Sequence, residues 1–195
     1  MLRQSFNRNK TIFLNIKMCE DIFKIYTDGA CTNNGKLNAR CSIGVYFSDK
    51  NTVKLKDISK VLQVEKSSNN VAELTAIYEA LKIYQKSELF LPLQIYSDSK
   101  YSINCITKWY PSWVLKDCVQ SKENHKLIKD IYDKYSEMKK NHDIHLQYIK
   151  AHTGFNDEHS IGNSIADRLA TDALKKFDKP RIDIRKFFQD DTLSL

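Results

Sequence analysis

The spacing of apolar residues changes near residue 70, and this change limits the folds that the chain can adopt. Before that point, the segments 21–29, 39–49 and 52–62 are short apolar or alternating runs of the kind that forms β-strands. Asn- and Gly-rich residues between the first two segments predict a hairpin. From residue 70 to 86 the apolar residues recur at helical spacing, which predicts an amphipathic helix.

The rest of the chain alternates strand-like and helical segments. Strands are expected at 93–97 and 145–149, and helices at 99–108, 124–140 and 163–177. The order βββαβααβα predicts an α/β fold with a five-stranded mixed sheet, in which three antiparallel strands are followed by two parallel strands and helices flank both faces. We expect this domain to span 21–178, after a flexible basic arm at 1–20 and before a tail at 179–195 that docks through Phe187 and Phe188.

Composition narrows the class of partner and the compartment. A net charge of +7 over 195 residues suits a polyanionic partner such as nucleic acid. No apolar run reaches the roughly 18 residues that a membrane span needs, so we expect no membrane association. Five cysteines without a CxxC pair indicate free thiols, with Cys41 and Cys105 buried, in a reducing compartment such as the cytoplasm or nucleus. A mitochondrial location is the alternative, because the first 19 residues carry basic side chains and no acid.

Four acidic residues lie at expected segment edges: Asp28, Glu73, Asp98 and Asp167. Each has a structural explanation when it is considered alone. Asp28 could start a turn, Glu73 could complete a capping box with Asn70, Asp98 could cap a helix, and Asp167 could favour the first turn of one. Considered together, clustered carboxylates repel one another unless cations neutralise them, and all-oxygen ligands favour Mg²⁺ or Mn²⁺.

The segments DGACTNNG, NNVAEL, IYSDSKYSINCITKW and AHTG…GN..ADRLA together resemble the four motifs of type 1 ribonuclease H, the ribonuclease HI family. The resemblance covers 21–177 and implies a ribonuclease H-like fold. It also implies an endonuclease that hydrolyses the RNA strand of RNA–DNA hybrids with two Mg²⁺ ions, for which Mn²⁺ can substitute, leaving 5′-phosphate and 3′-hydroxyl ends. By the same resemblance Asp28 would bridge both ions, Glu73 and Asp98 would hold one, and Asp167 the other.

The resemblance further implies roles outside the carboxylates. His152 corresponds to a histidine in a mobile loop that assists proton transfer or product release; a loop histidine without a task is the alternative. Contacts to RNA 2′-hydroxyls are implied for Asn34, Asn69 and Asn70, contacts to a DNA phosphate for Lys66, Ser68 and Asn124, and an aromatic groove for deoxyribose for Tyr101, Trp109 and Trp113. The alternatives are turn formation by the asparagines and core packing by Trp109.

The sequence departs from the family pattern in one segment, and two alternative functions remain. The stretch at 156–160 makes the segment between His152 and Asp167 longer than in many relatives, and we expect it to be a loop that brings charge close to the site. Another nuclease of the same fold, such as an integrase, transposase or resolvase, is the first alternative function. A non-catalytic module that binds hybrids is the second. We expect a monomer, since no sequence feature requires an oligomer.

Overall fold

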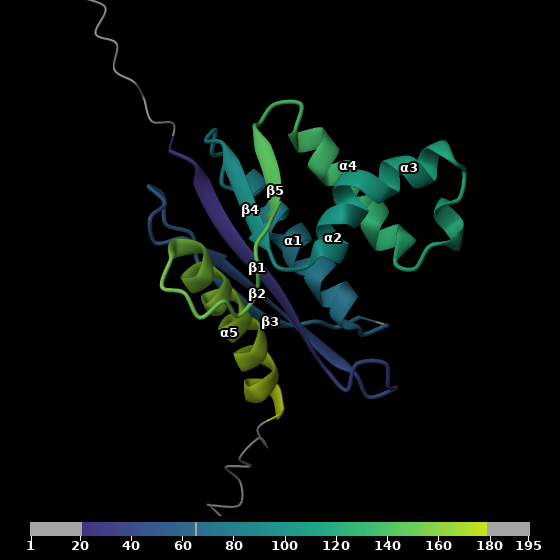
Figure 1. Ribbon diagram of the computed structural model, residues 1–195, viewed down its shortest axis with the longest axis horizontal. Helices are drawn as coiled ribbons and strands as arrows, with labels where there is room; N and C mark the ends of the chain where they lie inside the picture. Colours follow the sequence, from purple (N-terminus) through teal and green to yellow (C-terminus); the bar gives the residue numbers. More distant parts are fainter. Residues whose placement is uncertain (1–20, 65, 179–195) are drawn as a thin grey trace, which may run out of the picture.

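Five strands form a sheet at the centre of the computed structural model, which describes residues 21–64 and 66–178 (Figure 1). Their order across the sheet is β3-β2-β1-β4-β5. The strands are β1 (Phe23–Thr32), β2 (Arg40–Phe47), β3 (Ile58–Val61), β4 (Leu93–Ser97) and β5 (Ile144–Tyr148). The first three pair antiparallel, and β4 and β5 join them in parallel register, so the predicted mixed sheet is confirmed.

Helices connect the strands in the predicted order. They are α1 (Asn69–Lys86), α2 (Lys100–Asn104), α3 (Tyr110–Leu115), α4 (His125–Met138) and α5 (Glu158–Asp178). A π-helical turn, η1 (Cys105–Trp109), joins α2 to α3, so the helix expected at 99–108 continues further than predicted; a 3₁₀ turn, η2 (Val119–Ser121), precedes α4. Within the described residues, no helix combines the length and the apolar character that crossing a membrane requires.

The two faces of the sheet bury separate apolar clusters. Ile25 belongs to the larger cluster, where α1 packs on β1 and β2 and α4 packs on α1. Tyr26, the next residue, belongs to a smaller cluster beneath α5, which packs on β1, β2 and β3. This alternation places helices on both faces, as predicted. Cys41 and Cys105 are buried, also as predicted.

Two strand boundaries differ from the prediction. β1 does not end at Gly29 but continues to Thr32, opposite β2. The third strand, expected over 52–62, is limited to β3, because the Asp57 carboxylate accepts the Phe47 N–H at 3.0 Å in place of a backbone partner. The ladder between β2 and β3 therefore begins only at the pair Val45 and Ile58. The expected arm at 1–20 and the tail at 179–195, with Phe187 and Phe188, lie outside the described residues.

Glycine at position 44 lets the backbone of α5 lie directly on β2. A Cβ atom at Gly44 would lie 2.0 Å from the carbonyl oxygen of Ala166 and 2.7 Å from the amide nitrogen of Ala170. The hydroxyls of Ser42 and Ser59 donate to α5 carbonyl oxygens at 2.6 Å each, which holds the helix in this position. Because Gly44 is paired with Asp28 in the β1–β2 register, α5 is held beside that carboxylate.

We predict that Gly44→Ala destabilises the protein by about 1–3 kcal/mol, because the new methyl group must displace the α5 backbone. Urea denaturation followed by circular dichroism would measure the change. Gly35→Asn is the matched control: Gly35 has a φ of 80° with nothing within 4 Å of a Cβ, and Asn tolerates this conformation. Equal stabilities for Gly44→Ala and the unmodified chain would contradict the close approach.

Candidate active site

Three carboxylates from different elements meet at the end of β4. One oxygen each from Asp28, Glu73 and Asp98 lies within 4.8 Å of the others. The parallel register of β1 and β4 pairs Thr27 with Ser97, so Asp28 and Asp98 follow at neighbouring positions. The structure thus brings together three of the four acids that the sequence predicted as one site.

Glu73 reaches this cluster from α1, but not as a helix cap. The N-cap of α1 is Ser68, whose hydroxyl accepts the Val71 N–H at 3.3 Å, so the capping box with Asn70 is wrong. Glu73 lies in the second turn and is only 5% exposed. A Cβ on Gly29 would lie 2.3 Å from the Glu73 amide nitrogen, so only glycine there lets α1 approach β1 this closely.

Asp167 lies in the third turn of α5 rather than in its first. The helix begins at Glu158, because the Asp157 carboxylate accepts the N–H groups of His159 at 2.9 Å and Ser160 at 3.1 Å. Asp167 is outside the group of oxygens within 4.8 Å, yet its charge contributes to the raised pKa of Asp28. The fourth predicted acid therefore lies beside the cluster on its α5 side.

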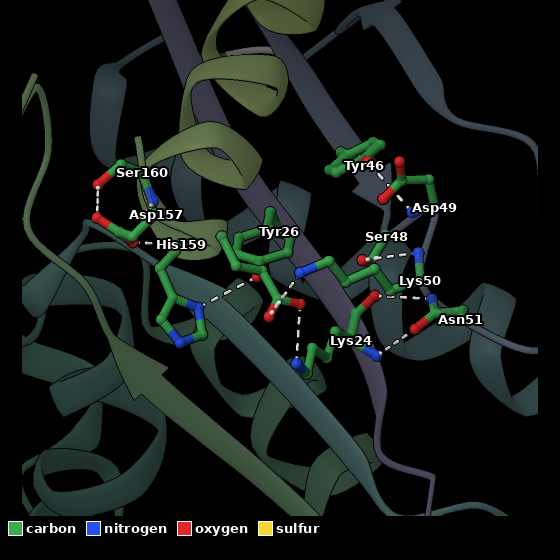
Figure 2. A network of polar contacts seen from close by, with 11 residues as sticks. Lys24, Tyr26, Tyr46, Ser48, Asp49, Lys50, Asn51, Asp157, His159 and Ser160 are labelled. Carbon is green, nitrogen blue, oxygen red and sulfur yellow. Dashed lines mark hydrogen bonds and ion pairs between the residues drawn. The ribbon is translucent and has the colours of Figure 1, made fainter. Parts of the chain in front are cut away.

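The residues at 156–160 are not an added loop that brings charge to the carboxylates. Glu158 accepts from the Lys24 ammonium at 2.8 Å and pairs with Lys50 at 3.4 Å, near the start of β1. The His159 ring centroid lies 4.4 Å from that of Tyr96, and the His159 ring hydrogen-bonds to the Tyr26 hydroxyl at 3.1 Å (Figure 2). These contacts fix the first turn of α5 against the sheet.

Burial and mutual repulsion make the cluster hard to ionise. Burial, with the charges of Asp98 and Asp167, raises the pKa of Asp28 from its ordinary value near 3.8 to about 7. Burial, with the charges of Asp28 and Asp98, also raises the pKa of Glu73. The Glu73 Oε2 atom is buried without a hydrogen-bond partner among the described residues. An all-oxygen donor set with an unpaired buried oxygen fits a hard divalent cation, which would relieve both the repulsion and the missing partner.

Asn163 is a site residue that our sequence reasoning missed. Its Nδ2 donates to Asp98 Oδ2 at 3.0 Å, and the residue is only 3% exposed. Its Oδ1 is buried without a hydrogen-bond partner in the described part of the chain. The signal was present in the sequence, because Asn163 precedes Asp167 by four residues and so lies on the same face of a helix.

His152 lies between β5 and α5, exposed and with a positive φ of 47°. It lines a cavity of about 650 Å³ together with Asp167, Asn163 and Arg168. The structure therefore places the predicted histidine and the fourth predicted acid on the walls of the same cavity.

The predicted RNA contacts gather where the β1–β2 hairpin meets the start of α1. The Asn34 side-chain oxygen accepts the Asn69 N–H at 3.1 Å, which joins the hairpin to the helix. Ser68 and Asn70 lie on either side of Asn69, all at the first turn of α1. Asn33, rather than Asn34, takes the left-handed turn conformation, with a φ of 51°.

The predicted DNA contacts fall in three places: the aromatic residues lie on α2, η1 and α3, Asn124 precedes α4, and Lys66 and Ser68 precede α1. Tyr101 meets Trp109 edge to face at 5.9 Å, and Trp109 lies 6.3 Å from Trp113. Trp109 is 38% exposed, so its alternative assignment to the core is wrong. Asn124 donates to the Tyr101 hydroxyl at 3.5 Å, and Lys66 pairs with Glu123 at 2.5 Å, next to Asn124.

Comparisons with known proteins agree with this architecture. The model of the RNase H family matches residues 20–175. Ribonuclease H of Orientia tsutsugamushi is 34% identical over 76% of this chain and 79% of that protein. Ribonuclease H of Schizosaccharomyces pombe is 34% identical over 78% of this chain. The chain spans about half the length of the S. pombe protein and of mouse ribonuclease H1, 53% and 50% respectively.

Solved structures show the same fold. The PFV RNase H domain has a TM-score of 0.60 and 26% identity, covering 77% of this chain and 93% of that one. LC11-RNase H1 in complex with an RNA/DNA hybrid has a TM-score of 0.54 and 21% identity, covering 80% and 98%. With the family match over most of its length and the acids placed as described, the chain belongs to the ribonuclease H family.

Proposed function

We propose that this chain is an Mg²⁺-dependent endonuclease that hydrolyses the RNA strand of RNA–DNA hybrids and leaves 5′-phosphate and 3′-hydroxyl ends. The observation that carries the proposal is the meeting of Asp28, Glu73 and Asp98 within 4.8 Å, with Asp167 acting on Asp28. A hybrid substrate is supported by family membership and by the relative whose structure holds an RNA/DNA hybrid.

Each site residue has a proposed role that follows from its position. Asp28, Glu73 and Asp98 would hold one cation, and Asp28 and Asp167 a second, because the charges of both Asp98 and Asp167 act on Asp28. When bound, the cations supply an activated water and stabilise the leaving 3′ oxygen. Asn163 keeps the Asp98 carboxylate oriented through its 3.0 Å hydrogen bond. His152, on the wall of the same cavity as Asp167, would hold or pass a proton at its exposed imidazole.

Asp98→Asn should reduce cleavage at least about 100-fold while changing hybrid affinity less than twofold, because the amide keeps the shape but loses the ligand charge. The assay is cleavage of a labelled hybrid in Mg²⁺, beside EDTA, all-DNA and all-RNA controls. Asp172→Asn is the matched acid in α5, where it pairs with Lys175 on the surface, and should leave the rate unchanged. Retained turnover in Asp98→Asn would remove Asp98 from the site, and binding without any cleavage in the unmodified chain would favour a non-catalytic module.

Asp28→Asn should raise the melting temperature in EDTA at pH 8 by roughly 3–8 °C. The pKa of Asp28 is raised in the fold, so its protonated form stabilises the protein fully below pH 3.8, and this contribution is lost as the pH rises through about 7. Mg²⁺ should then raise the melting temperature of the unmodified chain and not that of Asp28→Asn. Differential scanning fluorimetry measures both effects. Asp130→Asn, at an exposed position in α4, is the control; an Mg²⁺ shift as large in Asp28→Asn would contradict the assignment.

Asn34→Ala and Asn70→Ala should each lower the preference for hybrid over duplex DNA about fivefold, the effect of losing one hydrogen bond. Competition binding with the two duplexes in EDTA measures this preference without cleavage. Asn38→Ala, an exposed residue of the same hairpin, is the control. Unchanged selectivity in both variants would mean that the 2′-hydroxyls are recognised elsewhere.

A further inference from the structure

Two cysteines face each other across the β1–β2 hairpin. Cys31 and Cys41 are directly paired in the antiparallel register, and their Sγ atoms lie 2.8 Å apart. This separation is well inside the sum of two sulfur van der Waals radii. Directly opposed residues of antiparallel strands have Cα atoms about 4.5–5.5 Å apart, which lies within the 4.4–6.8 Å range of disulfides. The two thiols can therefore be joined without a change of register or of backbone path.

The two thiols differ in exposure, so we expect Cys31 to react before Cys41 on oxidation. Cys31 is partly exposed near the loop of the hairpin, whereas Cys41 has no exposed surface. Burial, followed by the neighbouring Cys31 thiol, raises the pKa of Cys41 to about 12. An accessible thiol beside a buried one is the arrangement in which the first is attacked from solvent and the second completes the bond.

We propose that Cys31 and Cys41 form an oxidisable dithiol site that reacts with small-molecule disulfides such as oxidised glutathione. The Cys31 thiolate attacks one sulfur of the small disulfide, forms a mixed disulfide and releases one thiolate. Cys41 then attacks the Cys31 sulfur, and its proton passes to the departing second thiolate. The protein dithiol is oxidised by two electrons, and the small disulfide is reduced to two thiols.

The position of this pair connects it to substrate recognition, and this connection rests on the proposed function. The Cys41 Sγ lies 3.2 Å from the carbonyl oxygen of Ser68, the N-cap of α1. The adjoining residue, Asn69, is held to the hairpin by Asn34. A disulfide removes the Cys41 S–H that donates to Ser68, and it cross-links the hairpin close to its loop. We therefore expect it to displace the predicted 2′-hydroxyl contacts and to leave the carboxylates in place.

Tryptic mapping tests the bond directly in the 195-residue chain. After incubation with oxidised glutathione and alkylation of the remaining thiols, trypsin cuts at Lys36 and Arg40, between the two cysteines. We expect the peptide 25–36 to be linked to the peptide 41–50, and the intact mass to fall by about 2 Da. Cys118→Ser, which removes another partly exposed thiol, should leave this product unchanged, whereas Cys31→Ser should abolish it. A lasting glutathione adduct at Cys31 with Cys41 still alkylated would overturn the proposal, as would no reaction at Cys31.

Hybrid binding then tests the consequence. Oxidation should weaken hybrid affinity in EDTA roughly fivefold, about the effect of one hydrogen bond, and dithiothreitol should restore it. Cys31→Ser should bind hybrid equally well before and after treatment. Unchanged affinity of a chain shown by mapping to be linked would overturn the connection to recognition. If the reduced chain fails to cut hybrids in Mg²⁺, the proposed function fails, and the peptide map still decides the dithiol site independently.

Discussion

Two close approaches of helix backbone to the sheet determine the rest of this structure. At Gly29 the chain of α1 comes so near to β1 that a methyl group would overlap the Glu73 amide, and at Gly44 the chain of α5 comes equally near to β2. Asp28 precedes the first glycine and is paired with the second. The two helices therefore bring their acids to one residue of the central strand, from the two faces of the sheet. β4 ends at Ser97, which pairs with Thr27, so no strand residue of β4 lies opposite Asp28 and the Asp98 side chain can approach it.

This arrangement stores electrostatic strain in the fold. Carboxylates that are buried together resist ionisation, and the raised pKa values of Asp28 and Glu73 express that resistance. The site is thus less stable at neutral pH than a neutral substitute would be, and a bound cation reverses the balance. The only side-chain amide that the described residues place on Asp98 comes from Asn163, so the orientation of one ligand depends on α5 as well.

The sequence predicted the order of elements and the meeting of three of the four acids, because apolar period and strand register are local and regular properties. It misplaced features whose cause lies elsewhere in the chain. The first strand is expected to end at residue 29, although Gly29 serves the contact with α1 by its small size and β1 continues beyond it. The charged residues after Asp157 were interpreted as a loop, although Asp157 caps a helix. The pairing of Cys31 with Cys41 depends on a hairpin register that spacing along the chain does not specify.

The fixed first turn of α5 limits how far His152 can travel. On one side the Ile149 N–H donates to the Ser97 carbonyl at 3.0 Å, and on the other Asp157 caps the helix that Lys24 and Tyr26 hold to β1. The residues 150–156 between these points can extend to roughly 25 Å at most. His152 is thus held in a short segment whose two ends are fixed to the sheet that carries Asp28. The length of this segment limits the positions that His152 can take in the cavity. Lengthening or shortening the segment would therefore change those positions while leaving the carboxylates in place.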